Sequence, residues 1–288
     1  MALKIPTLAL HLILASAALC ACTSRPVPEA PPAQADAPPP QDQIPQALQP
    51  DLPSPPLAPA AIADVDGLLS LLEQAQEHAI RGDELRARLY FKRALDLDRA
   101  NKTALVGMAE SFERERNLPD AEKFFKKALL LDERDVELLS LLALMMRVQD
   151  RREEALAFST RLVNAAPNDA NALALHGLLS LEADQLEEAI ALFQRTLAID
   201  PRQPEVANNL ANAYRQNNQP DKAEPLYREI LADTPRNPDV HYNLGAALQD
   251  QGRYEEADAA YAEALRINPD HDAADDALDA LRRFMRQR

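Results

Sequence analysis

Residues 238–271 read PDVHYNLGAALQDQGRYEEADAAYAEALRINPDH. Two small residues in this stretch, Gly245 and Ala257, allow two antiparallel helices to approach closely. Tyr261 supplies bulk between neighbouring hairpins. Pro269 ends the second helix because its ring clashes with the preceding helical turn. The stretch therefore predicts a hairpin of two helices.

The same pattern recurs upstream at intervals of 34 residues. One position holds alanine every time: Ala87, Ala121, Ala155, Ala189, Ala223 and Ala257. A second position holds only small residues: Ala75, Ala109, Ala143, Gly177, Ala211 and Gly245. A third is aromatic with one departure, Ser159: Phe91, Phe125, Ser159, Phe193, Tyr227 and Tyr261. The proline recurs in the last four intervals, and Arg99 and Glu133 take its place in the first two. Because the same residue types recur at the same positions from one interval to the next, the sequence predicts a series of similar hairpins.

This spacing resembles the tetratricopeptide repeat (TPR), a helix-turn-helix unit of 34 residues. The resemblance implies an all-α, right-handed solenoid in which each hairpin buries its apolar face against its neighbours. The six repeats expected are 68–101, 102–135, 136–169, 170–203, 204–237 and 238–271. Residues 272–288 are expected to form a capping helix, with Ala274, Ala277, Leu278, Leu281 and Met285 on one face.

Proline 225 falls inside the second helix of the fifth repeat. If Asp221 is the N-cap of that helix, Pro225 lies at the end of its first turn. The backbone then loses only the hydrogen bond to the carbonyl of the cap, at a modest cost in stability.

The composition supports a helical protein and disfavours one class of partner. The chain has no Trp and six Gly, which fits a helical stack better than a β-rich fold. The formal net charge of −15 argues against a nucleic-acid ligand, because phosphate binding requires clustered Lys and Arg. The acidity is compatible with a basic partner, but a solvated surface explains it equally.

Residues 1–21 have the features of a secretory signal peptide. Lys4 supplies a positive start, and the apolar run from Leu8 to Ala21 is too short to span a bilayer. Its end, Leu19-Cys20-Ala21-Cys22, resembles a bacterial lipobox, which implies cleavage before Cys22 and lipid attachment to its thiol. Cys20 is the poorer candidate, because Leu19 would occupy the small-residue position. The alternative is that both cysteines are ordinary residues of a cleavable signal.

Two further expectations concern the segment that follows. Thr23 stands where the inner-membrane retention rule of Gram-negative lipoproteins requires Asp, so we expect an outer-membrane lipid anchor that leaves the protein facing the periplasm. Residues 22–67 are rich in proline, and such a segment cannot bury enough apolar surface to fold. We expect it to act as a semi-extended spacer.

Residues with catalytic or metal-binding potential do not cluster in the sequence. The five histidines are scattered, and none has a ligand partner at helical spacing. His176 and His241 take positions that are mostly leucine in the other repeats, so we expect both to pack in or near the core. Phosphate-binding loops and nucleophile motifs are lacking. The sequence predicts a protein that is not an enzyme and has no cofactor.

The resemblance places the binding surface on the first helix of each hairpin. Family positions 2, 5, 6, 9 and 12 face the groove. In the middle repeats these include Leu141, Leu144, Leu175, Leu178 and Leu181, which we expect to be shared core. In the last two repeats they include Asn208, Asn209, Asn212, Arg215, Tyr242, Asn243 and Gln249. Amides both donate and accept hydrogen bonds, so they can pair with the backbone of an extended peptide. Alternatively, Asn209 and Asn243 bond only within the helix ends or to water.

One specific groove of the family is not expected. A carboxylate clamp for chaperone tails requires Lys and Arg as well as Asn across three successive repeats. The next helix offers Ala273 and Ala277 where the cations should stand.

The combined architecture suggests a non-enzymatic scaffold that assembles a cell-envelope complex. Lipobox, spacer and six repeats together resemble the pilotin lipoproteins of type IV pili and the TPR lipoproteins of Tad-type pili. Pilus or secretin biogenesis is therefore the first hypothesis. The alternatives are an adaptor for periplasmic proteases or peptidoglycan enzymes, a component of an exopolysaccharide exporter, and a TPR-scaffolded enzyme.

Overall fold

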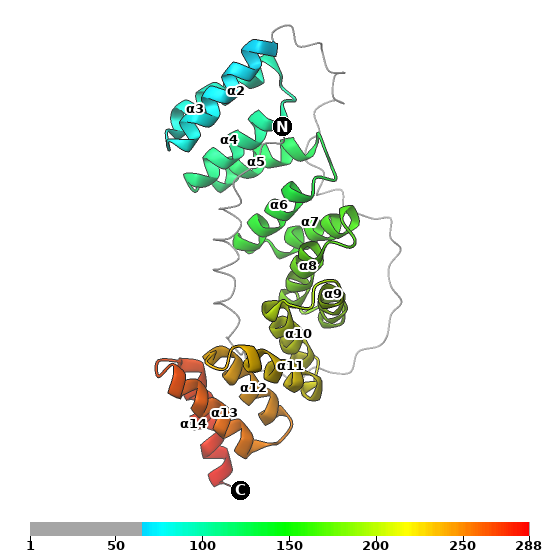
Figure 1. Ribbon diagram of the computed structural model, residues 1–288, viewed down its shortest axis with the longest axis vertical. Helices are drawn as coiled ribbons and strands as arrows, with labels where there is room; N and C mark the ends of the chain where they lie inside the picture. Colours follow the sequence, from blue (N-terminus) through cyan, green and yellow to red (C-terminus); the bar gives the residue numbers. More distant parts are fainter. Residues whose placement is uncertain (1–64, 288) are drawn as a thin grey trace.

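The computed structural model describes residues 65–287, and all regular structure in this range is helical. Six helical hairpins follow one another along the chain and a final helix closes the stack (Figure 1). The first helices of the hairpins are α2 (Val65–Ile80), α4 (Lys102–Arg114), α6 (Val136–Val148), α8 (Ala170–Glu182), α10 (Pro204–Gln216) and α12 (Pro238–Asp250). The second helices are α3 (Glu84–Leu97), α5 (Leu118–Leu129), α7 (Arg152–Ala165), α9 (Leu186–Ile199), α11 (Pro220–Asp233) and α13 (Tyr254–Ile267). The final helix is α14 (Asp272–Arg286). The predicted all-α solenoid of six hairpins with a cap is confirmed.

The signal segment 1–21, the lipid-attachment residue Cys22 and the spacer up to residue 64 lie outside the described residues.

The repeating columns of the sequence form the interior of the stack. All six alanines of the invariant column are completely buried. The glycines of the small column lie against aromatic rings: a Cβ atom on Gly245 would come within 2.7 Å of the Tyr261 ring, and one on Gly177 within 2.8 Å of the Phe193 ring. A side chain larger than a methyl group there would force the two helices of a hairpin apart, which explains why the column is restricted to glycine and alanine.

The turn inside each hairpin places one residue in the left-handed backbone region. The residue occupies the same position in all six repeats, with φ between 54° and 77°: Gly82, Arg116, Asp150, Asp184, Asn218 and Gly252. This conformation ends the first helix and reverses the chain direction.

The two ends of the stack are closed by polar surfaces. In α2, Ser70 and Gln74 occupy positions that are buried against the preceding hairpin in every later repeat. Their side chains instead hydrogen bond to each other at 3.0 Å. At the other end, α14 buries Ala274, Leu278 and Leu281 against hairpin six and exposes its charged residues. Terminal repeats of a solenoid need such polar outer faces.

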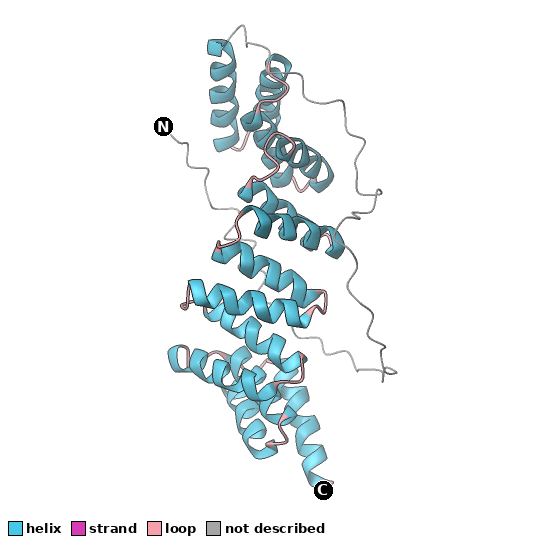
Figure 2. Cartoon of the chain, turned by 90° about the vertical axis from the view of Figure 1, so that its right-hand side faces the viewer, coloured by secondary structure: helices cyan, strands magenta, loops and turns pink. Residues whose placement is uncertain are grey.

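First helices contact each other at four of the five junctions between hairpins, and we call the side of the stack that they form the inner face. Helix α2 packs on α4, α6 on α8, α8 on α10, and α10 on α12. Figure 2 shows the hairpins stacked along the long axis of the molecule. Side chains on neighbouring first helices can therefore reach one another across hairpins.

Charged networks join neighbouring hairpins on the side of the second helices. Arg151 contacts Glu154 and reaches Glu122 of the preceding hairpin, at 3.0 Å from Nη2 to Oε1. Arg253 contacts Glu224 in the equivalent arrangement, at 2.7 Å from Nη1 to Oε2. Burial opposes ionisation of Glu122 and Glu224, but hydrogen bonds to cationic partners, together with one from Gln251 to Glu224, lower the pKa of both carboxyls below the ordinary value.

The expected capping of α11 is wrong. Gln219 is the N-cap and Pro220 is the first helical residue, so Asp221 already lies inside the helix. Pro225 is consequently the sixth helical residue and removes the hydrogen bond that its N–H would have donated to the carbonyl of Asp221. Proline is favoured at the first position of a helix, so Pro220 sets the start of α11 and Asp221 follows inside the first turn.

Candidate functional site

All seven candidate binding residues lie on the first helices of hairpins five and six. Helix α10 carries Asn208, Asn209, Asn212 and Arg215, and helix α12 carries Tyr242, Asn243 and Gln249. Gln249 is exposed, Asn243 is buried, and the other five are half-buried. Because α10 packs on α12, the seven residues share one region of the inner face.

Asn243 links the two helices. Its Nδ2 donates a hydrogen bond to Oδ1 of Asn208 at 3.3 Å, and only 7% of the residue is exposed. This contact joins neighbouring hairpins, whereas the sequence suggested either a ligand or bonds within the helix ends or to water. Asn209 is half-buried and makes no side-chain hydrogen bond within residues 65–287, so its amide is available to a ligand.

Two phenols hold the other amides in a defined orientation. The hydroxyl of Tyr227 donates to Oδ1 of Asn212 at 2.6 Å, and that of Tyr261 donates to Oε1 of Gln249 at 3.2 Å. Burial raises the pKa of the Tyr261 phenol far above its ordinary value, so it remains a donor at neutral pH. Since the carbonyl oxygens are occupied, Asn212 and Gln249 have their N–H groups left to offer a ligand, and these groups make no hydrogen bond within residues 65–287.

Arg215 has spare donors on the same surface. Its Nη1 lies 3.3 Å from Oδ2 of Asp250, while its Nε is buried and has no hydrogen-bond partner among the described residues. The equivalent pair two repeats earlier, Arg147 with Glu182, uses both Nε and Nη2, at 2.8 Å and 2.6 Å. Aspartate is one methylene shorter than glutamate, so it reaches only one side of the guanidinium.

Tyr242 forms the apolar side of this region. Its ring centroid lies 5.7 Å from that of Tyr261 and 5.3 Å from that of His271. His271 is fixed in turn, because its Nδ1 accepts the N–H of Ala274 at the start of α14. The aromatic group thus joins the candidate site to the capping helix.

The leucines of the middle hairpins belong to the core, as expected. Leu144 is buried, and Leu141 and Leu175 pack against the largest apolar cluster. Leu178 and Leu181 pack against a second cluster, formed around Phe193 and Leu210.

A serine, a histidine and a carboxylate also come together, but not as a reactive site. Ser159 Oγ lies 2.8 Å from His176 Nδ1, and His176 Nε2 lies 3.5 Å from Glu188 Oε1. Ser159 is completely buried, so no substrate can reach its hydroxyl. Within residues 65–287, no group of three or more His, Cys, Asp or Glu side chains could hold a metal ion. Nor does any helix in that range combine the length and hydropathy needed to cross a bilayer.

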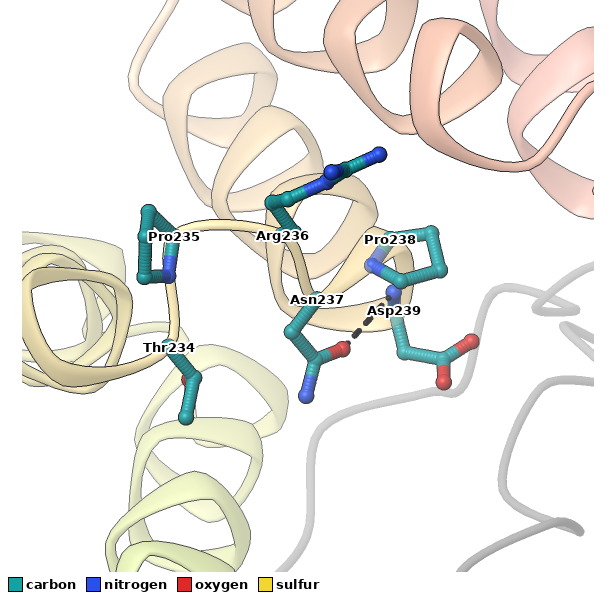
Figure 3. A pocket seen from close by; sticks show the side chains of 6 residues that line it. All are labelled: Thr234, Pro235, Arg236, Asn237, Pro238 and Asp239. Carbon is teal, nitrogen blue, oxygen red and sulfur yellow. Dashed lines mark hydrogen bonds between the residues drawn. The ribbon is translucent and has the colours of Figure 1, made fainter.

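A hollow at the turn between α11 and α12 is also a poor candidate for a site. Figure 3 shows its lining, which runs from Thr234 to Asp239. The amide of Asn237 caps α12, accepting the N–H groups of Asp239 at 3.1 Å and Val240 at 3.2 Å. The Oδ1 atom of Asn237 therefore stabilises the start of α12 and is unavailable to a ligand.

Sequence reasoning missed three contributors to the candidate site: Tyr227, Tyr261 and Asp250. The two tyrosines were assigned only a packing role. A signal was present, since the aromatic column changes from Phe to Tyr in the same two repeats that carry Asn212 and Gln249. The Arg215–Asp250 ion pair also had a signal in the sequence: its two residues are 35 positions apart, the same separation as in the ion pair of Arg147 with Glu182.

Comparison with known proteins is consistent with this geometry. Family models described as tetratricopeptide repeat match residues 72–136, 180–232 and 208–272, which together exceed half of the chain. No curated protein matches the sequence.

Several solved structures share the fold. YrrB, described as a TPR protein with an unusual peptide-binding site, has 20% identity and a TM-score of 0.58 over 65% of this chain and 96% of its own. The pilF protein of Pseudomonas aeruginosa has 19% identity and a TM-score of 0.57 over 75% of this chain and 98% of its own. MamA has 21% identity and a TM-score of 0.55 over 58% of this chain and 92% of its own. At these identities the likeness establishes the fold alone.

Proposed function

The chain belongs to the tetratricopeptide repeat family, and we propose that it binds an extended protein segment on the inner face of hairpins five and six. Proteins of this fold are generally non-catalytic scaffolds for protein–protein interaction. YrrB, which has a peptide-binding site, offers a precedent within the same fold.

The observation that carries the proposal is the orientation of the amides by Tyr227 and Tyr261. The phenols occupy the carbonyl oxygens of Asn212 and Gln249, and the amide N–H groups of both residues make no hydrogen bond among the described residues. Arg215 adds the Nη N–H groups that Asp250 does not engage. The matching ligand presents a row of oxygen acceptors, and the carbonyl groups of an extended peptide backbone supply such a row whatever its side chains.

We further propose that the protein acts at a bacterial outer membrane, anchored through Cys22 and facing the periplasm. The lipobox-like sequence and Thr23 support the anchor, and the proline-rich sequence of residues 22–64 supports a spacer between lipid and solenoid. The expected spacer boundary at residue 67 is wrong, because α2 begins at Val65. Within this setting, assembly of a pilus or secretin complex is the first candidate role. Adaptors for proteases or peptidoglycan enzymes and components of a polysaccharide exporter are the alternatives.

A crosslinking pulldown from native envelopes, with wild type compared with Cys22→Ala, tests the anchor and the pathway. Recovery of secretin or pilus proteins that declines with Cys22→Ala supports the first role. Recovery dominated by cell-wall hydrolases, proteases or polysaccharide exporters replaces it with an alternative. Recovery that is unaffected by Cys22→Ala contradicts the proposed anchor.

A further inference from the structure

The first hairpin exposes three large apolar side chains near its turn and along α3. Ile80 is 87% exposed, Leu85 is 73% exposed and Leu89 is 47% exposed. Leu85 and Leu89 are one helical turn apart, so they lie on the same side of α3. Since they project away from the interior, the core of the solenoid does not explain them.

The other five hairpins have different residues at the positions of Leu85 and Leu89. The position of Leu85 holds Pro119, Glu153, Glu187, Asp221 and Glu255. That of Leu89 holds Lys123, Ala157, Ala191, Pro225 and Ala259. An acidic residue near a helix start is favoured by the helix dipole, and four of the five other hairpins have one at the position of Leu85, whereas α3 has its acidic residues at Asp83 and Glu84. The comparison within one chain shows that the repeat itself does not require apolar residues there.

Basic side chains accompany the leucines. Lys92 and Arg93 follow Leu89 by three and four residues, so all lie on the same face of α3. Both are exposed, and neither forms an ion pair within residues 65–287; Arg93 stacks over the ring of Tyr90. This combination is unusual in a chain with a formal net charge of −15. We call Ile80, Leu85, Leu89, Lys92 and Arg93 the α3 patch.

An anionic bilayer surface fits the α3 patch better than a second copy of the chain does. In a symmetric dimer through this face, the unpaired cations of both copies would oppose each other. A bilayer surface offers phosphate groups to Lys92 and Arg93 and an apolar boundary to the leucines. The patch also lies on the hairpin that directly follows the N-terminal segment with its apolar run from Leu8 to Ala21.

We propose that the α3 patch docks the first hairpin onto the surface of an anionic lipid bilayer. Leucine side chains enter the headgroup region, and Lys92 and Arg93 pair with lipid phosphates. Docking would fix the membrane-proximal end of the solenoid and leave the inner face of hairpins five and six, at the far end of the stack (Figure 1), free for a partner. The inference deepens the proposed membrane association and is independent of peptide binding.

Tryptophan fluorescence tests docking directly, because the full chain contains no Trp. Leu89→Trp places a single indole in the patch, and Ala191→Trp places one at the equivalent exposed position of α9. Both full-length variants are mixed with phosphatidylglycerol vesicles and with neutral phosphatidylcholine vesicles. We expect the emission of Leu89→Trp to shift to shorter wavelength with phosphatidylglycerol only, and that of Ala191→Trp to stay constant.

Charge variants provide the matched control. In the Leu89→Trp background we combine Lys92→Gln with Arg93→Gln. Each lost charge should weaken vesicle binding roughly fivefold, so the lipid concentration that gives half of the maximal emission shift should rise about 25-fold. The control combines Lys123→Gln with Lys127→Gln on α5, which removes the same net charge elsewhere. This change should leave the vesicle concentration for half-maximal shift unaltered.

Three outcomes would overturn the inference. The first is an unshifted Leu89→Trp in protein that sediments with phosphatidylglycerol vesicles, because another part of the chain then makes the contact. The second is an equal shift at both indoles. The third is a shift without vesicles that grows with protein concentration, which would identify a second copy as the occupant. None of these results would affect peptide binding on the inner face.

Discussion

Single residues at the hairpin turns carry a left-handed backbone conformation that glycine adopts without strain, that Asn and Asp tolerate, and that is least favourable for Arg116. Arg116 has φ of 59° at the position where Gly82 and Gly252 stand in the first and last repeats. The left-handed region brings the Cβ atom too close to a carbonyl oxygen, at a cost of roughly 1 kcal/mol. Four of the six turns in the described structure retain this strain.

Arg116→Gly should therefore stabilise the protein by about 1 kcal/mol, measured by thermal or urea unfolding. Arg116 is exposed, so no packing is lost with its side chain. Gly252→Arg makes the reverse change in another turn and should destabilise by a similar amount. A neutral or destabilising Arg116→Gly would show that the turn is not strained.

Pro225→Ala should also stabilise, by about 1–3 kcal/mol, because the helix regains the hydrogen bond to the carbonyl of Asp221 and loses a steric clash. Alanine already occupies the equivalent position at Ala157, Ala191 and Ala259. Pro220→Ala is the control: Pro220 is the first helical residue, where proline costs nothing. Equal responses to the two substitutions would contradict the capping of α11 by Gln219.

At the scale of whole elements, α7 and α8 are joined by a pair of residues that departs from the repeat. Ser159 replaces the aromatic residue of its column, and His176 replaces an apolar residue in the next hairpin. The two side chains are joined by a hydrogen bond of 2.8 Å, and together they fill the space that a phenylalanine and a leucine would otherwise share. Treating each column separately predicts a gap at Ser159, so the compensation could be recognised only from the structure.

Ser159→Ala should destabilise the protein by about 1–3 kcal/mol, because His176 Nδ1 loses its buried partner. Ser159→Phe alone should destabilise more through overpacking, whereas Ser159→Phe combined with His176→Leu should recover much of the loss. A double-mutant cycle measured by urea unfolding checks the coupling. Additive effects would contradict the proposed compensation.

The same pair sets a pH dependence of stability. Burial lowers the pKa of His176, although the carboxylate of Glu188 opposes this effect. The folded state therefore holds its proton more weakly than the unfolded state, whose histidine has a pKa of about 6.5. Stability should be fully present above that pH and should decline as the pH falls below it. The Ser159→Phe/His176→Leu variant should lack this decline in unfolding experiments between about pH 7 and pH 5.

For the whole molecule, the hairpin repeat was predictable because each column has one physical role. The column of alanines is buried in every hairpin and the column of aromatic residues recurs in five of the six, so the period survives the replacement of individual residues. The location of the candidate residues on α10 and α12 followed from the same period. The direction of their hydrogen bonds did not, because an amide can donate or accept and only the positions of Tyr227 and Tyr261 select between the two.

The central claim is that these phenols prepare the inner face for a protein segment. Tyr227→Phe combined with Tyr261→Phe tests it, since phenylalanine occupies this column in three other hairpins. We expect the fold to be retained, with a loss of about 2 kcal/mol or less from two neutral hydrogen bonds. Binding should weaken, because Asn212 and Gln249 can then turn their amides freely.

The most direct measurement is site-specific photo-crosslinking in native envelopes, with a photoreactive amino acid at position 209 on the inner face and at position 191 on the outer side as control. We predict a defined crosslinked partner from position 209 only, and a yield reduced about tenfold by the double Tyr→Phe change, equivalent to one lost hydrogen bond. An undiminished yield from position 209 in a stably folded Tyr227→Phe/Tyr261→Phe protein, or the same partner captured equally from position 191, would contradict the account.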